Sequence, residues 1–160
     1  MSHWLIKSEP TVFSFADLAA STGRRTRWDG VRNYQARNFI RDRMTEGDLA
    51  FFYHSSCEEP AIMGIVKVVS AGYPDPTAFD PSDPHYDAAS NPDDPRWFVV
   101  DVRYQRALAR PITLRELKKY QDDALSELML LRRGNRLSVM PVADDEWKFI
   151  VGLEQRKSRE

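Results

Sequence analysis

Short apolar runs recur along the chain, and their spacing changes between the two-residue period of strands and the 3.6-residue period of helices. Residues 4–7 and 49–53 are too short for helices and are bounded by polar or turn residues, which predicts buried strands. Residues 97–104 alternate apolar and polar positions, as a strand with one buried face does. Strands are therefore predicted at residues 4–7, 49–53, 62–73, 97–104 and 137–142, with a bulge at Gly64.

Helices are predicted where a capping residue precedes apolar residues at helical spacing. Ser14 and Thr113 each have an acidic residue three positions later, which is the pattern of a capping box. Residues 33–44 place apolar side chains on one helical face and arginines on the others. Further helical segments are predicted at residues 125–131, ending before Gly134, and after a cap at Asp144 or Asp145.

Together these elements predict an α+β domain. The chain has 160 residues, which is the length of one ordinary domain, and it shows no internal repeat or break in composition. The short strands and the turns between them favour a curled, barrel-like sheet of about five or six strands with helices around it. We therefore expect a single domain over residues 1–155 and a polar C-terminal tail over residues 156–160.

Cysteine and histidine content argues against several kinds of chemistry. The single cysteine, Cys57, cannot form an internal disulfide, and the three histidines lack the spacing of metal ligands. We expect no metal and no cofactor, because the chain also lacks a phosphate-binding glycine loop. No apolar run is long enough to span a bilayer and no signal peptide is recognisable, so we expect a cytoplasmic protein without a membrane partner.

Charge is distributed unevenly, although the formal net charge is only −1. Residues 24–43 are rich in arginine, which favours a basic face. Residues 73–95 combine prolines with aspartates and contain no lysine or arginine. Since proline fixes the backbone and removes a hydrogen-bond donor, this segment is predicted to be a long loop, and the sequence leaves its role open.

Polar residues are concentrated where predicted strands and helices begin or end, at residues 7–9, 28–35, 53–57 and 132–138. A nucleobase site needs a flat group for stacking and fixed hydrogen-bonding groups for the edge of the base. Trp28 and Tyr34 supply such planes, and Trp28 is the preferred candidate. The groups suited to the base edge are Ser8, Glu9, Asp29, Asn33, Gln35 and His54, and those suited to phosphate are Lys7, Arg32 and Arg136.

Several long motifs resemble those of EVE domains, a family of the PUA-like superfamily. They are WLIKSEP at residues 4–10, WDGVRNYQARN at 28–38, FFYHS at 51–55, YPDP at 73–76 and NRLSV at 135–139. The chain is also similar to the thymocyte nuclear protein family. This resemblance implies a PUA-like curled β-barrel with surrounding helices. It also implies a non-catalytic reader of a modified base, such as a modified cytosine in DNA or a modified base in RNA.

The resemblance further implies a base-binding pocket that these motifs form together. Its expected members are Lys7, Ser8 and Glu9 at the mouth, Trp28, Asp29, Val31, Asn33 and Tyr34 in the wall, Tyr53, His54 and Ser55 on another side, and Arg136 with Ser138. The expected phosphate contacts are Arg32, Arg37 and Arg133.

Two alternatives stay open beside the binding module. One is an enzyme that acts on a nucleotide or modified nucleic acid, with Glu9, Asp29 or His54 as general acid or base. The other is a domain that binds a small molecule or a protein. The sequence does not identify the modification or decide between DNA and RNA. It does not fix the oligomeric state either, for which we expect a monomer.

Overall fold

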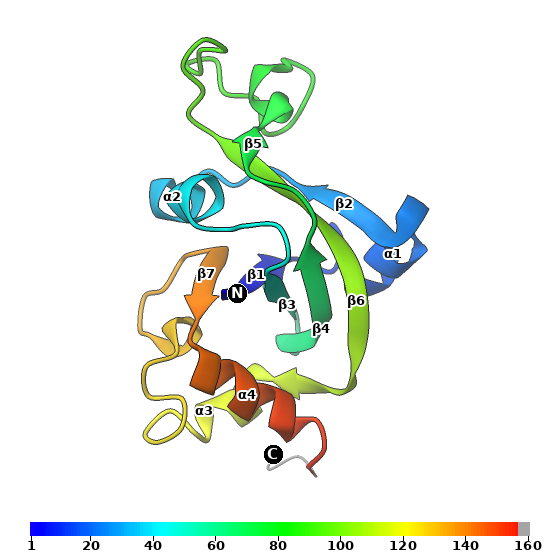
Figure 1. Cartoon of the computed structure of the whole chain (residues 1–160), viewed down its shortest axis with the longest axis vertical. Helices are drawn as coiled ribbons and strands as arrows, with labels where there is room; N and C mark the ends of the chain where they lie inside the picture. The colour runs from blue at the N-terminus through cyan, green and yellow to red at the C-terminus, as the bar shows by residue number, and fades with distance from the viewer. Residues whose placement is uncertain (157–160) are drawn as a thin grey trace.

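The structure, a computed structural model, describes residues 1–156 and contains seven strands over that range. The strands are β1 (His3–Ser8), β2 (Arg25–Trp28), β3 (Leu49–His54), β4 (Ala61–Val68), β5 (Tyr73–Pro74), β6 (Phe98–Thr113) and β7 (Val139–Val142). The α-helices are α1 (Phe15–Ala20), α2 (Tyr34–Asp42), α3 (Leu114–Lys118) and α4 (Asp144–Leu153), and the 3-10 helices are η1 (Thr22–Arg24), η2 (Pro76–Phe79) and η3 (Met129–Leu131). The predicted α+β class is confirmed (Figure 1).

The strands form one mixed sheet in the order β2-β6-β4-β3-β1-β7, and β5 pairs with the start of β6. The β1–β3 pair is parallel, and the other pairs are antiparallel. Across residues 1–156 this path ends at β2 and β7 without closing, so the predicted curled β-barrel of about five or six strands is not confirmed. The sequence-based prediction missed β2 and did not separate β5, because strands of four and two residues carry too short a pattern to recognise.

β6 is the longest strand, and it curves along one side of the molecule (Figure 1). The sequence predicted only its first half, at residues 97–104. The predicted strand at 62–73 is instead two strands, since β4 ends at Val68 and β5 begins at Tyr73. The register between β4 and β6 shifts between Ile62 and Gly64, which confirms the predicted bulge. A bulge strengthens the local twist and so bends the sheet.

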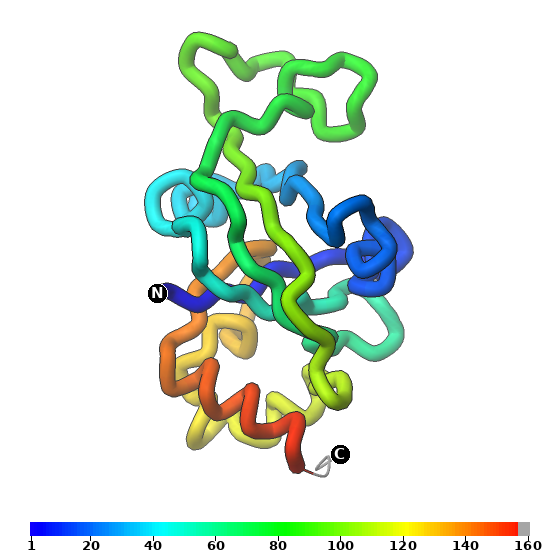
Figure 2. The backbone as a smooth tube through the Cα atoms, turned by 45° about the vertical axis from the view of Figure 1, so that its right-hand side comes forward, coloured from blue at the N-terminus to red at the C-terminus, as the bar shows by residue number. Residues whose placement is uncertain are grey.

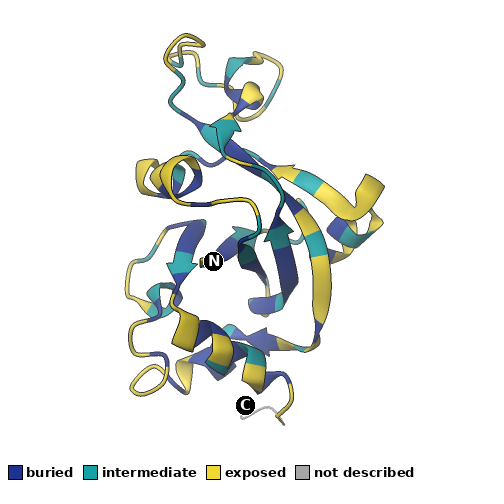
Figure 3. Cartoon of the chain, viewed as in Figure 1, coloured by how far each residue is buried: buried dark blue, intermediate teal, exposed yellow. Residues whose placement is uncertain are grey.

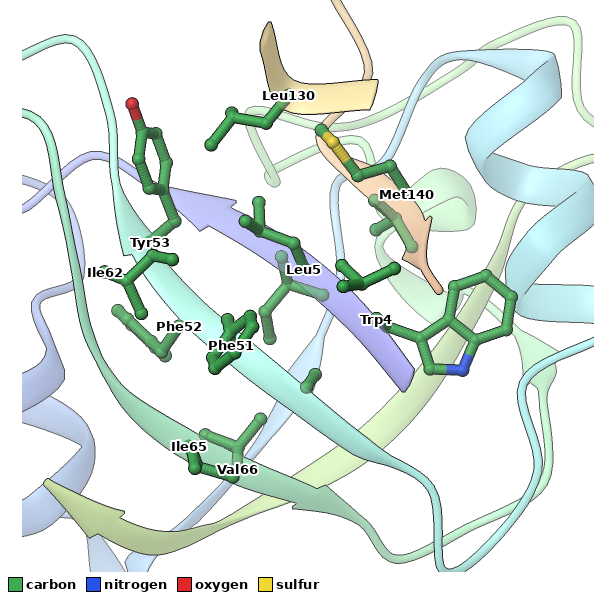
Figure 4. Close-up of a cluster of buried hydrophobic side chains, with 14 of the residues drawn as sticks. Trp4, Leu5, Phe51, Phe52, Tyr53, Ile62, Ile65, Val66, Leu130 and Met140 are labelled. Atoms are coloured by element: carbon green, nitrogen blue, oxygen red, sulfur yellow. The ribbon is translucent and has the colours of Figure 1, made fainter. Parts of the chain in front are cut away.

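The central strands β1, β3 and β4 are buried on both faces, as their dark colour in Figure 3 shows, whereas β2 and the middle of β6 are largely exposed. On one face of β3, Phe51 stacks on Trp147 of α4 with ring centroids 3.9 Å apart. On the other face, Phe52 contacts Phe15 of α1 and Trp28 of β2. Successive strand residues point to opposite faces, so neighbouring residues of β3 build two different layers of the core (Figure 4).

The helix starts follow the predicted caps in most cases. The Ser14 hydroxyl accepts the backbone N–H of Asp17 in a capping box, and the Thr113 hydroxyl accepts the backbone N–H of Glu116 at the start of α3. Two predictions were wrong. Residues 125–131 form turns and the 3-10 helix η3 rather than an α-helix, and α4 is capped at Ala143, so that Asp144 is its first residue.

The proline-rich segment after β5 projects at one end of the molecule (Figures 1 and 2). It is a loop, as predicted, except for β5 itself and η2. Residues 157–160 of the predicted polar tail lie outside the described residues. Among residues 1–156, no helix is long and apolar enough to cross a membrane.

Candidate functional site

A cleft of about 520 Å³ opens where the end of β1, the end of β2 and the segment after β2 meet, and we call it the Trp28 cleft. This volume lies within the range of about 300 to 1,000 Å³ that small-ligand sites occupy. Seven of the predicted base-pocket residues line it: Lys7, Ser8, Glu9, Trp28, Asp29, Val31 and Ser138. Its other lining residues are Val12, Phe13, Thr26, Arg27, Gly30 and His85.

Trp28 lies at the bottom of this cleft. It is the last residue of β2 and pairs with Val100 of β6, so the sheet fixes its backbone. The indole packs edge-on against Phe52 with ring centroids 5.5 Å apart, and only 8% of the residue is exposed. Trp28 is therefore anchored in the core and offers a small apolar surface to the cleft.

The end of β1 supplies the polar groups on one side of the cleft. The backbone N–H of Lys7 donates to the carbonyl oxygen of Ser138 at 2.9 Å, which joins two segments that are far apart in the sequence. Burial lowers the pKa of the Lys7 ammonium below its ordinary 10.5. The Ser8 hydroxyl donates to the carbonyl oxygen of Phe13 at 2.6 Å. The cleft thus combines a partly desolvated cation with fixed backbone groups.

An ion pair next to Trp28 also lines the cleft, and one of its two residues, Arg27, was not predicted from the sequence. The Arg27 guanidinium lies 3.3 Å from the Asp29 carboxylate, and both residues line the cleft. Arg27 and Thr26 belong to β2, where side chains alternate between the two faces of the sheet. Recognising Arg25 to Trp28 as a strand would have placed Thr26 on the same face as Trp28, whereas the same rule puts Arg27 on the other face, so no sequence signal pointed to Arg27.

His85 joins the cleft from the proline-rich loop, and no local sequence pattern pointed to it. Its imidazole lies against Gly30, where a β carbon would come within 2.6 Å of the ring. Arg32 holds this arrangement, because its guanidinium donates to the His85 carbonyl oxygen at 2.6 Å and to Asp75 at 3.0 Å. The structure therefore places Arg32, a predicted phosphate contact, in an internal clamp that ties the loop to the cleft.

Asp75 is the centre of that clamp and is completely buried. Burial opposes its ionisation, but hydrogen bonds from Thr77, Gly30 and Arg32 outweigh this effect, so the pKa of its carboxyl lies below 3.8. The backbone N–H of Gly30 donates to Asp75 at 3.0 Å. A buried charge that is paired and hydrogen-bonded in this way fixes the segment after β2 relative to the loop.

Three predicted residues at the end of β3 do not line the cleft. Tyr53 is buried among the hydrophobic side chains of Figure 4, on the same face of β3 as Phe51, and burial together with the Cys57 charge raises its pKa to about 12. The His54 ring accepts the backbone N–H of Phe15 at 3.0 Å, and burial lowers its pKa below 6.5. The backbone N–H of Ser55 donates to Ser8.

A second hollow of about 420 Å³, which we call the arginine cleft, lies beside the first. Its lining residues are Asn33, Gln35, Met129, Arg132, Arg133, Gly134, Asn135, Arg136 and Leu137. Two predicted base-pocket residues, Asn33 and Arg136, lie here rather than in the Trp28 cleft. The Asn33 side chain caps α2 by accepting the N–H of Ala36, which leaves its amide N–H groups for other partners. Leu137 of this cleft and Ser138 of the Trp28 cleft are consecutive in the chain.

Tyr34 and Arg37 lie on the outside of α2, away from both clefts. Tyr34 is 53% exposed and stacks on Trp97 with ring centroids 4.9 Å apart. The Arg37 guanidinium lies over the Tyr34 ring and donates to the carbonyl oxygen of Arg96. Neither residue contributes to the Trp28 cleft in this structure.

No metal site accompanies these groups. Within the part of the chain that the structure describes, no group of three or more His, Cys, Asp or Glu side chains is arranged to hold a metal ion. The two clefts together offer apolar surface from Trp28 and Val31, fixed hydrogen-bonding groups and several arginines. Such a combination is typical of a ligand-binding site with a basic surface beside it.

Comparison with known proteins identifies the family. The EVE domain family matches residues 2–153, so the chain belongs to that family. Thymocyte nuclear protein 1 of Gallus gallus is 46% identical over 97% of this chain and 69% of the relative. Human THYN1 protein, solved in complex with 5-methylcytosine containing DNA, superposes with a TM-score of 0.94 at 45% identity, covering 98% of this chain and 99% of that one.

A bacterial structure shows the same architecture. A protein from Pseudomonas putida superposes with a TM-score of 0.89 at 48% identity, covering 96% of this chain and 99% of that one. The comparisons also correct one prediction. The cytoplasmic location expected from the absence of a signal peptide is contradicted by the relatives, whose common name is that of a nuclear protein.

Proposed function

We propose that this protein binds DNA that carries a modified cytosine and takes the modified base into the Trp28 cleft. The observation that carries the proposal is the similarity to human THYN1 in complex with 5-methylcytosine containing DNA, which extends over 98% of this chain. The cleft supports the proposal as well, because it gathers seven residues that sequence chemistry or family resemblance assigned to a base pocket.

The cleft has the parts that a base reader needs. Trp28 and Val31 are buried residues that supply apolar surface for the ring and for a methyl group. Lys7, Asp29 and Glu9 supply charged groups near the edge of the base. A base inside a duplex cannot reach such a cleft, so binding requires that the base be extruded from the stack.

The arginine cleft is the proposed contact for the DNA backbone. Arg133 and Arg136 line it together with Arg132, and no acidic residue shares the lining. Ser138 of the Trp28 cleft directly follows Leu137 of the arginine cleft in the chain. The DNA strand that carries a base in the Trp28 cleft would therefore pass close to the arginine cleft. Phosphate contacts fix the register of a protein on nucleic acid, while the base contacts supply specificity.

We propose a binding module over residues 1–155 rather than an enzyme. His54 uses its ring nitrogen to accept the N–H of Phe15, and Asp29 is paired with Arg27. Two of the three candidate bases are therefore held by other groups of the protein, whereas a general base needs to reach the proton it removes. The third, Glu9, lines the cleft, where it can also contact the edge of a bound base. These contacts favour a role in shaping the cleft.

The test is a fluorescence anisotropy titration of matched DNA and RNA oligonucleotides that carry cytosine or 5-methylcytosine at one position. We expect selective binding of the modified DNA, and Trp28→Phe should weaken it by about tenfold, which corresponds to roughly 1.4 kcal/mol. Trp147→Phe is the matched control, because Trp147 is equally buried but lies on the opposite face of the sheet. Equal affinity for modified and unmodified DNA contradicts the proposal, and preference for RNA redirects it.

A further inference from the structure

Val12 protrudes from the rim of the Trp28 cleft, and this exposure has no explanation within the isolated protein. It is 75% exposed and lines the same cleft as Lys7 and Trp28. Among the described residues, only Met1 at the chain start is a more exposed large hydrophobic side chain. Single apolar residues on a surface are ordinary, so the position of Val12 has to be combined with how it is held.

The turn that carries Val12 is braced on both sides. The backbone N–H groups of Val12 and Phe13 both donate to the carbonyl oxygen of Glu9 at 2.9 Å. The Ser8 hydroxyl donates to the carbonyl oxygen of Phe13 at 2.6 Å, and the Phe13 ring packs against Phe52 of the core. The turn is thus fixed to β1 and to the sheet, and Val12 is held outward at the mouth of the cleft.

We infer that Val12 is a wedge that enters the space left in a DNA duplex when a base is extruded into the Trp28 cleft. This inference rests on the proposed function and adds the residue that makes extrusion from a duplex favourable. Extrusion exposes the apolar faces of two neighbouring bases, and apolar side chains inserted between base steps cover such surfaces in other DNA-binding proteins. A side chain beside the mouth of the cleft is in the position to do so.

The surroundings of Val12 fit a nucleic-acid partner. Lys7 and Arg27 line the same cleft, and Arg24 and Arg25 immediately precede the β2 residues that form its wall. Cations beside the cleft attract the phosphates next to an extruded nucleotide. Val12 should affect binding only when the modified base is paired in a duplex, because a base taken from a single strand leaves no gap within a helix.

The test compares one 5-methylcytosine oligonucleotide as a single strand and as a duplex. Val12→Ser should weaken binding of the duplex by about tenfold and binding of the single strand by less than about twofold. Val12→Leu should keep duplex affinity, and Thr11→Ala, a neighbouring exposed position, is the control. Thermal unfolding should be unchanged, since position 12 is exposed.

The outcomes separate the wedge from the cleft. If Val12→Ser affects neither substrate, or both equally, the wedge is overturned while the base cleft stands. Binding of the single strand without any binding of the duplex by the unmodified protein also overturns it. Failure of the unmodified protein to distinguish 5-methylcytosine from cytosine in either form rejects the proposed function and the wedge together.

Discussion

The imidazole of His85 covers Gly30 on the side where every other amino acid carries its β carbon. Gly30 also has a positive φ of 77°, a conformation that residues with a side chain rarely adopt. The loop after β5 therefore closes against the segment after β2, and two segments far apart in the sequence become one wall of the Trp28 cleft. This contact makes the proline-rich loop part of the candidate site.

Gly30→Ala should lower both stability and ligand affinity. The new methyl group collides with His85 and the backbone is strained, so we expect the free energy of unfolding to fall by about 1 to 2 kcal/mol. Gly152→Ala is the control, because it lies in α4 with no atom near its added β carbon, and it should raise stability by about 0.5 to 1 kcal/mol. Urea unfolding measures both, and equal effects would show that the His85 contact is unimportant.

Two substitutions of Trp28 should separate its contribution to the stability of the fold from its contribution to ligand binding. Trp28→Ala leaves a cavity beside Phe52 and should destabilise the fold by about 3 to 5 kcal/mol. Trp28→Phe keeps most of the packing and should chiefly reduce affinity for the modified base. Melting temperature and anisotropy, measured on the same samples, distinguish the two effects. If the Phe variant binds as tightly as the unmodified protein, Trp28 is a core residue alone.

The arginines of the two regions should differ in their salt dependence. Arg133→Gln and Arg136→Gln should each reduce the slope of log affinity against log salt by about one, as the loss of one phosphate contact does. Arg32→Gln should leave the slope unchanged and lower stability instead, because its guanidinium is bound to Asp75 and His85. A reduced slope for Arg32→Gln would show that this residue does contact phosphate, as the sequence suggested.

Lowering the pH should weaken the contact between the proline-rich loop and the segment after β2, because ionised Asp75 holds the two together. Its pKa is lower in the folded protein than the ordinary 3.8, so the unfolded chain binds its proton first and stability falls as the pH drops. The contribution is complete above pH 3.8 and is lost as the pH falls through the lower folded pKa. Asp75→Asn should cost roughly 2 to 3 kcal/mol at neutral pH and flatten the dependence in this window. Unfolding curves between neutral pH and the acid range measure it.

His54 should give the stability of the protein a second, weaker dependence on pH. Burial lowers its pKa below 6.5, and protonation would also remove the acceptor for the N–H of Phe15. The stabilisation by neutral His54 is therefore complete above pH 6.5 and is lost as the pH falls through the folded pKa. His54→Gln keeps an acceptor that does not titrate, so its stability should vary less with pH. Unchanged pH dependence in that variant would assign the window to another group.

Local chemistry of the sequence was enough for most of the longer elements and for part of the site. Caps at Ser14 and Thr113, the bulge at Gly64 and the apolar period of β3 depend on neighbouring residues, so they can be recognised without coordinates. The same is true of the polar groups that follow β1 and β2, because a side chain at a strand end sits at an edge of the sheet. These signals predicted Lys7, Ser8, Glu9, Trp28 and Asp29, and the resemblance to EVE domains added Val31 and Ser138; all seven line the Trp28 cleft.

Tertiary structure alone decided which polar groups face the cleft and which serve the fold. Tyr53 and His54 both belong to β3 and lie on opposite faces of it, but what packs on each face is not visible in the sequence: Tyr53 is buried in the core, and His54 accepts the backbone N–H of Phe15 in α1. Arg32 was predicted to contact phosphate, but its guanidinium donates to Asp75, a buried residue of the distant proline-rich loop. His85 enters from that loop because the same clamp fixes its backbone. A sequence pattern specifies the face and period of an element, whereas contacts between distant segments depend on how the elements pack.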